Sequence, residues 1–341
     1  MILMRRFPPH GKWDLKRLVV SVAIAGRHIG LSESDTARTA IDTVRSYRER
    51  ISDYGSMRAL DVWYDAISLK QVLKEVAREE DRGRIAQRVE KARAKSTPEY
   101  IFPKLAEEQG TVPRIVDDPP LIFHPTVEQT PELETRYSEG FAKYRESLPE
   151  HIRTLFDRFT FCDLAIKVVG VGSVGTFCGV ALFLAGDDDP IFLQIKEAKA
   201  SVLEPYAGKS LYANHGQRVV MGCHLMQSAS DLFLGWAESQ AGRHFYVRQL
   251  KDMKIKPLVE VYTPSAMLQY AELCGWTLAR AHARSGEPAK ISGYLGQSDQ
   301  FDQSVAAFSV AYADQSERDY ELLVKAVRAG KLDVYIEEDP A

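Results

Sequence analysis

The sequence has few cysteines and no long apolar run. Its four cysteines, Cys162, Cys178, Cys223 and Cys274, lie far apart and form no C-x-x-C pair. This pattern argues against a metal site or a disulfide framework and favours small buried residues in a reducing compartment. The N-terminal residues contain no apolar core of signal-peptide length, and no segment approaches the length of a membrane span. We therefore expect a cytoplasmic protein with no membrane partner.

An excess of one charge is also missing. The 44 Lys and Arg residues against 47 Asp and Glu residues leave a formal net charge of −3, whereas duplex-binding proteins usually carry a basic footprint. We expect no nucleic-acid partner. The eight histidines show neither H-x-x-x-H nor H-E-x-x-H spacing, which argues against a dedicated metal site. Ser173 and Ser201 have no G-x-S-x-G setting, so hydrolase chemistry is not supported.

The chain does contain a change from helical to strand-like periodicity along its length. Helical periodicity dominates the first hundred residues, and Ser32 with Asp35 resembles a capping box. Five prolines within Tyr100–Pro125 predict an extended linker. Thr263 followed by Pro264 predicts the start of another long helix. The predicted strands are Leu164–Val169, Gly179–Leu184, Ile191–Ile195 and His244–Leu250, with a helix predicted over Gly216–Phe233.

These patterns predict four regions. The first is a helical region over 1–125 with the extended linker at its end, and connecting helices follow over 126–158. A glycine-rich β lobe spans 159–260. A C-terminal helical region spans 261–341.

Three glycines, Gly170, Gly172 and Gly175, have the spacing G-x-G-x-x-G after a strand-like run. One interpretation is a dinucleotide-binding turn, which requires a helix directly after the glycines. The other is a β-hairpin that folds over the phosphates of ATP. The residues from Thr176 to Leu184 are largely β-branched, aromatic or glycine and lead into the turn Gly186–Pro190. The hairpin therefore fits better.

The hairpin interpretation also requires a lysine on the next strand to pair with phosphate charge. Lys196 meets this requirement 24 residues after Gly172, and Lys199 is a fallback beyond the predicted strand end. A following helix would bear an acid that orients the lysine. The helix starting near Gly216 has none in its first turn, and Glu204 is the nearest substitute.

Several phrases together resemble the bacterial DUF2252 family, in consistent order over nearly the whole chain. They are WDLKRLVVSV (13–22), VVGVGSVGT (168–176), LQIKEA (193–198), GQRVVMG (216–222), QSASDLFLGW (227–236), FYVRQLKDMK (245–254) and LARAHARSG (278–286). The resemblance implies a circularly permuted fold similar to aminoglycoside-phosphotransferase-like kinases. In this permuted order the C-terminal region over 261–341 packs with the N-terminal helices. It places Gly170, Gly172, Ser173, Gly175 and Lys196 in a nucleotide-binding lobe.

Members of this family typically carry G-D-x-H-x-x-N-F and D-F-D-E segments ahead of WDLKRL, which resemble a kinase catalytic loop and metal aspartate. Only MILMRRFPPHGK precedes Trp13. We therefore expect either a chain truncated at its N-terminus or one that binds without catalysing. His282 is a catalytic candidate, but its position is more typical of a helix-end residue that faces water or caps backbone carbonyls. The resemblance implies that Asp14 would support the absent catalytic loop. The alternative is an acid in the first turn of a helix, where the helix dipole favours negative charge.

The predicted fold is α+β and kinase-like in permuted order. A small antiparallel sheet with one packed helix adjoins a larger helical lobe. The predicted function is nucleotide binding, with ATP and magnesium as cofactors and an unknown small-molecule or protein acceptor for any phosphotransfer. A non-catalytic interaction protein and a nicotinamide-dependent enzyme are the alternatives. Loss of the upstream motifs would expose apolar surface, so marginal stability or self-association is also predicted.

Overall fold

The structure, a computed structural model, describes residues 8–75, 82–83, 86–87, 89–90, 105–109, 112–124, 131–170, 175–186, 189–250, 257–332 and 334. The chain divides into two compact units. The sheet unit falls within Ala77–Lys256, and the helical unit is built from Met4–Val76 and Pro257–Ala341. The helical unit therefore combines segments from both ends of the chain.

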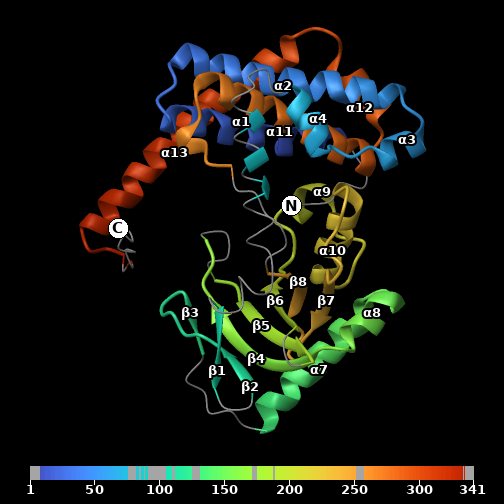
Figure 1. The fold of residues 1–341 in the computed structure, drawn as a ribbon. Coiled ribbons are helices and arrows are strands. Elements are labelled where there is room, and N and C mark those ends of the chain that lie inside the picture. The colour runs from blue at the N-terminus through green and yellow to red at the C-terminus, as the bar shows by residue number, and fades with distance from the viewer. Residues whose placement is uncertain are drawn as a thin grey trace. The chain divides into compact units, whose positions relative to one another are not determined.

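The sheet unit contains a six-stranded sheet in the order β3-β4-β5-β6-β8-β7, in which every neighbouring pair is antiparallel (Figure 1). Its strands are β3 (Ile122–Phe123), β4 (Thr160–Lys167), β5 (Cys178–Ala185), β6 (Asp189–Glu197), β7 (Gly235–Glu238) and β8 (His244–Gln249). The β5–β6 hairpin closes with Ala185 opposite Asp189, at the turn that the sequence predicts. The predicted α+β class with an antiparallel sheet is confirmed.

Alternation along the strands separates two faces of this sheet. Ala181, Phe183 and Leu193 belong to one core, together with residues of α7 (Pro131–Ser147) and α8 (Glu150–Phe156). Val180, Leu182 and Phe192 form the other core with apolar residues of the separate hairpin β1 (Ala106–Gln109) and β2 (Val112–Ile115). Helices α7 and α8 therefore cover one face, and the small hairpin covers part of the other.

Two parts of the sheet unit differ from the prediction. The proline-rich segment contains strands β1, β2 and β3 rather than only an extended linker, because Ala106, Ile115 and Ile122 are buried against the main sheet. Both α7 and α10 (His215–Met226) contact β7, where a single packed helix is predicted. Helix α10 also ends well before Phe233, since Asp231 accepts hydrogen bonds from the N–H groups of Phe233 and Gln249 and forms a turn there.

The helical unit contains long helices from both ends of the chain (Figure 1). They are α1 (Pro8–His28), α2 (Glu33–Ser56), α3 (Ala59–Tyr64), α4 (Leu69–Glu75), the short 3₁₀ turn η2 (Val259–Val261), α11 (Pro264–Ser285), α12 (Pro288–Leu295) and α13 (Gln300–Arg328). Ser32 caps α2, and Thr263 caps α11 with Pro264 in its first turn, as the sequence predicts. No helix within the described ranges is both long enough and apolar enough to cross a membrane.

Close packing and a buried ion pair hold these helices together. Gly275 lets α11 approach α2, because a Cβ at this position would lie 2.4 Å from the carbonyl oxygen of Thr43. Arg48 of α2 donates hydrogen bonds of 2.9–3.1 Å to the carboxylate of Asp302 of α13, which is fully buried. Breaking such a pair leaves an uncompensated buried charge, at a cost of about 3–5 kcal/mol.

Candidate functional site

The glycine-rich segment connects β4 to β5. Lys167 ends β4 and Cys178 begins β5, so no helix fits between Gly175 and the next strand. Gly175 is exposed and has φ of +71°, a left-handed conformation that favours glycine. Gly170 is also exposed, and a Cβ there would meet no atom within 4 Å. Gly172 and Ser173 lie outside the described residues.

The arm of this segment that returns to the sheet is attached to the end of β6. The Phe177 N–H donates to the Glu197 carboxylate over 3.0 Å, and the Glu197 N–H donates to the Phe177 carbonyl over 2.9 Å. Lys199 Nζ donates to the Gly175 carbonyl over 2.8 Å. Lys199, the predicted fallback, therefore contacts the glycine segment itself.

Glu197 is in turn held by Arg243. The guanidinium donates two hydrogen bonds, of 3.2 Å and 2.6 Å, to the two carboxylate oxygens. These hydrogen bonds lower the pKa of Glu197 below its usual value, and their effect is larger than that of burial, which raises it. Arg243 also lies near the rings of Phe177 and Phe245. The β7–β8 hairpin thus helps to position the arm that follows Gly175.

Lys196 lies opposite Cys178, at the base of the glycine segment. Strand alternation places Lys196 on the sheet face that carries Val180 and Leu182. Lys167 and Arg248 belong to the same face, and both act electrostatically on Cys178 together with Lys196. We call Lys167, Lys196 and Arg248 the cationic face.

Gln194 fixes the geometry in the middle of this face. Its side-chain oxygen accepts hydrogen bonds from Nε and Nη2 of Arg248, over 3.3 Å and 3.1 Å, and its amide nitrogen lies 3.6 Å from Cys178 Sγ. Within the described part of the chain, no carboxylate lies within ion-pair distance of Arg248. A guanidinium held by a neutral amide keeps its positive charge available to an anion.

The thiols near the cationic face are not activated. Burial raises the pKa of Cys178 by more than Lys196 and the other nearby cations lower it. Burial also raises the pKa values of Cys223 in α10 and of Tyr246 in β8. Cysteine reacts as the thiolate, so these groups are suited to packing rather than to nucleophilic catalysis.

Glu204, the nearest substitute in the sequence for an acid that would orient Lys196, begins the short helix α9 (Glu204–Ala207). It interacts electrostatically with His215 and Arg218 of α10. Arg218 is buried, which lowers its pKa, and it donates a 2.9 Å hydrogen bond to the Lys199 carbonyl. This bond joins α10 to the residue whose side chain contacts Gly175.

The two remaining sequence candidates lie in the helical unit, where His282 is in the last turn of α11, the helix end that the sequence predicts. His282 does not face water but is buried, with Nδ1 2.8 Å from Tyr47 Oη and Nε2 3.5 Å from Asp14 Oδ2. Asp14 lies beyond the first turn of α1. Burial, followed by the Asp14 charge, raises the pKa of Tyr47. These side chains form a polar cluster between α1, α2 and α11 rather than an accessible catalytic site.

Sequence reasoning found the glycines and Lys196 but missed Lys167, Gln194 and Arg248. Alternation from Lys196 could have placed Gln194 on the same face of β6. The position of Arg248 depends on its pairing with Gln194, a register that the sequence does not specify. Among the residues with described placement, no three His, Cys, Asp or Glu side chains are grouped to hold a metal ion.

A family model described as an uncharacterized protein conserved in bacteria matches residues 8–326, which confirms the family resemblance seen in the sequence. Neither the curated proteins nor the solved structures contain a significant match.

Proposed function

Because the chain belongs to DUF2252, a family of uncharacterized proteins conserved in bacteria, and carries a glycine-rich hairpin beside clustered cations, we propose that it binds a nucleotide, with ATP as the expected ligand. The observation that carries this proposal is the position of Lys196 opposite Cys178, at the base of the glycine segment. The phosphate groups would lie over the cationic face.

The charges of the cationic face suit a phosphate chain. Lys196 is the proposed point charge, and Arg248 can present two parallel N–H donors to one phosphate. Because Gln194 already holds the Arg248 guanidinium, less side-chain freedom is lost on binding. Lys167 adds a third positive charge on the same face.

The glycine segment would close over the phosphates. We propose that Gly170, Gly172, Ser173 and Gly175 let backbone N–H groups approach phosphate oxygens without obstruction by side chains. The bonds from Glu197 and Lys199 to the returning arm would keep the segment close to Lys196. A hairpin at this position favours ATP over the nicotinamide alternative, which requires a helix after the glycines.

The proposal covers binding and leaves phosphotransfer aside. Transfer needs a group that positions the acceptor and carboxylates that hold magnesium. Magnesium would arrive with the nucleotide, bound to its phosphates. A second candidate function, a non-catalytic interaction protein of the same fold, is favoured by apolar side chains exposed on α13. The two functions are compatible in one chain.

Calorimetric titration with a non-hydrolysable ATP analogue, with and without magnesium, tests the proposal. We expect the wild-type protein to bind and Lys196→Met to bind about one to two orders of magnitude more weakly, since a hydrogen bond to a charged group contributes roughly 1.5–3 kcal/mol. Lys209→Met, at an exposed lysine of the same unit, is the matched control and should bind like the wild type.

The melting temperature without nucleotide shows whether each variant is folded. Absence of binding by the wild-type protein would overturn the proposal. So would equal affinity of the wild type and a folded Lys196→Met variant.

A further inference from the structure

Helix α13 has two halves with different surroundings. In its first half, residues at helical spacing are buried against α1 and α2: Asp302, Val305, Ala306, Ser309 and Ala313. From Gln315 to Arg328 no residue is buried, and the helix continues beyond the bundle of its unit (Figure 1). At its start Glu317 pairs with Arg27 of α1 over 3.1 Å, and beyond Glu317 the helix has no buried residue up to Arg328.

This second half nevertheless carries large apolar side chains. Tyr320 is 67% exposed, Leu322 65% and Leu323 50%. Tyr320, Val324 and Val327 continue the helical stripe that is buried in the first half. Such a concentration of apolar surface on one helix is typical of an interaction site.

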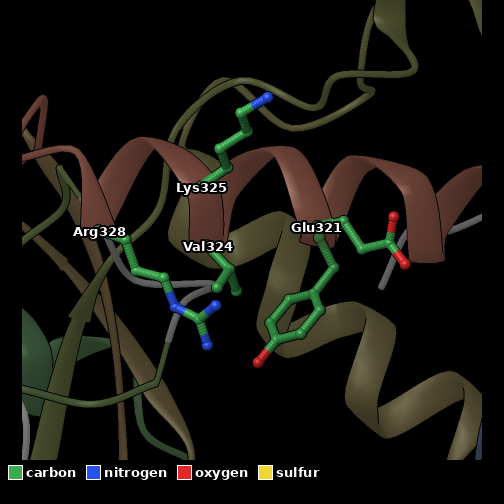
Figure 2. A pocket seen from close by; sticks show the side chains of 5 residues that line it. Glu321, Val324, Lys325 and Arg328 are labelled. Atoms are coloured by element: carbon green, nitrogen blue, oxygen red, sulfur yellow. The ribbon is translucent and has the colours of Figure 1, made fainter.

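The residues on this half are arranged symmetrically about Val324. Tyr320 and Arg328 each lie four residues from it and line a depression of about 380 Å³ together with Glu321, Val324 and Lys325. Figure 2 shows the Val324 and Arg328 side chains on one side of α13 and Lys325 on the other. In an antiparallel pair of two such helices with the twofold axis at Val324, Tyr320 of each copy would face Arg328 of the other. An arginine over a tyrosine ring is a favourable contact.

The charges along the helix fit the same arrangement. Residues 314–321 contain four acids and one base, Asp314, Glu317, Arg318, Asp319 and Glu321, whereas residues 322–331 contain three bases and no acid, Lys325, Arg328 and Lys331. Asp314 and Glu317 pair with Arg27 of α1, so Asp319 and Glu321 are the acids that the proposed arrangement uses. An antiparallel pair brings the acidic stretch of each copy beside the basic stretch of the other, while a parallel pair opposes like charges. We therefore propose that residues 319–329, at the end of α13 and centred on Val324, pair with the same residues of a second copy of this chain, in antiparallel orientation.

Sedimentation at several protein concentrations tests this dimer with charge variants that stay on the surface. Asp319→Lys/Glu321→Lys makes the segment basic, and Lys325→Glu/Arg328→Glu makes it acidic. We expect the wild type to dimerise, each variant alone to dimerise about tenfold or more weakly, and an equal mixture of the two to dimerise again. Higher salt should weaken the wild-type dimer.

Lys70→Glu/Lys74→Glu on α4, at two exposed lysines of the same unit, applies the same change in charge elsewhere and should leave the dimer intact. Circular dichroism establishes that every variant is folded. A wild-type protein that stays monomeric at its highest soluble concentration overturns the proposal. Variants that dimerise normally on their own, or a mixture that does not associate, also overturn it.

Discussion

Glu197 joins the arm that follows Gly175 to the β7–β8 hairpin. It bonds Phe177 through both backbone and side chain, and it pairs with Arg243 across the sheet edge. Its neighbour Lys196 points to the opposite face of β6. One strand end therefore carries both the proposed phosphate contact and the support of the segment that would cover it.

This support predicts how stability depends on pH. The folded-state pKa of Glu197 lies below its ordinary value because of Arg243. The stabilisation is therefore complete above the unfolded-state pKa of roughly 4.3 and is lost as the pH falls through the lower folded-state pKa. We expect Arg243→Met to reduce the free energy of unfolding by about 1 kcal/mol at neutral pH, and this difference to shrink at acid pH.

Melting temperatures of wild type and Arg243→Met between neutral and acid pH measure the effect. Methionine keeps much of the apolar stem that lies near Phe177 and Phe245. Arg158→Met, at an exposed arginine of the same unit, is the control and should show no such dependence. If the difference in melting temperature between wild type and Arg243→Met stays the same at acid pH, the Glu197 charge is not the source of that difference.

Local residue patterns account for what the sequence could predict of the site. The glycine spacing and Lys196 are visible within 27 residues of one another, because a hairpin is a local structure. Arg248 meets Gln194 only through pairing of β6 with β8, across 54 residues of chain. The cationic face as a whole therefore could not be derived from spacing alone.

At the scale of elements, helix starts and the β5–β6 hairpin were predictable, and strand partners distant in the sequence were not. The side chains of Ser32 and Thr263 each accept a hydrogen bond from the backbone N–H three residues further along the chain. The sequence signal for each helix start therefore lies within four consecutive positions. The β1–β2 hairpin depends on distant residues, since Ala106 and Ile115 are buried against β4, β5 and β6. The prolines of that segment predict a linker. The residues that bury its strands lie elsewhere in the chain, so the local sequence does not indicate those strands.

The contact between α11 and α2 gives a prediction at this scale. Gly275→Ala would place a Cβ 2.4 Å from the Thr43 carbonyl oxygen, so the helices must move apart. We expect it to lower the free energy of unfolding by about 1–3 kcal/mol. Gly293→Ala in α12 meets no atom within 4 Å and should raise the free energy of unfolding by up to about 1 kcal/mol.

Urea unfolding followed by helical circular dichroism compares the two variants. The same substitution in two helices of one unit isolates the effect of close packing from that of helix propensity. If both variants shift stability in the same direction by similar amounts, the close approach at Gly275 is not a constraint on the helical unit.

At the scale of the whole molecule, the sheet unit and the helical unit have separate cores. The helical unit is closed by long-range contacts such as Arg48 with Asp302, which lie 254 residues apart. No local pattern predicts such a pair. The expectation that the C-terminal helices join the N-terminal ones rests on the family resemblance, as does the kinase-like ancestry, which remains a prediction.

The central claim is that the cationic face binds the phosphates of ATP, and affinity labelling tests it most directly. In an acyl-phosphate derivative of ATP, a nearby lysine amine attacks the acyl carbon, an amide forms, and ATP leaves as the bond to phosphate breaks. Mass spectrometry then identifies the labelled lysines. We predict that Lys196 is acylated and that excess ATP prevents it, while Lys209 is labelled equally with and without ATP. Labelling of Lys196 that ATP does not prevent, or ATP protection confined to lysines of the helical unit, would contradict the account.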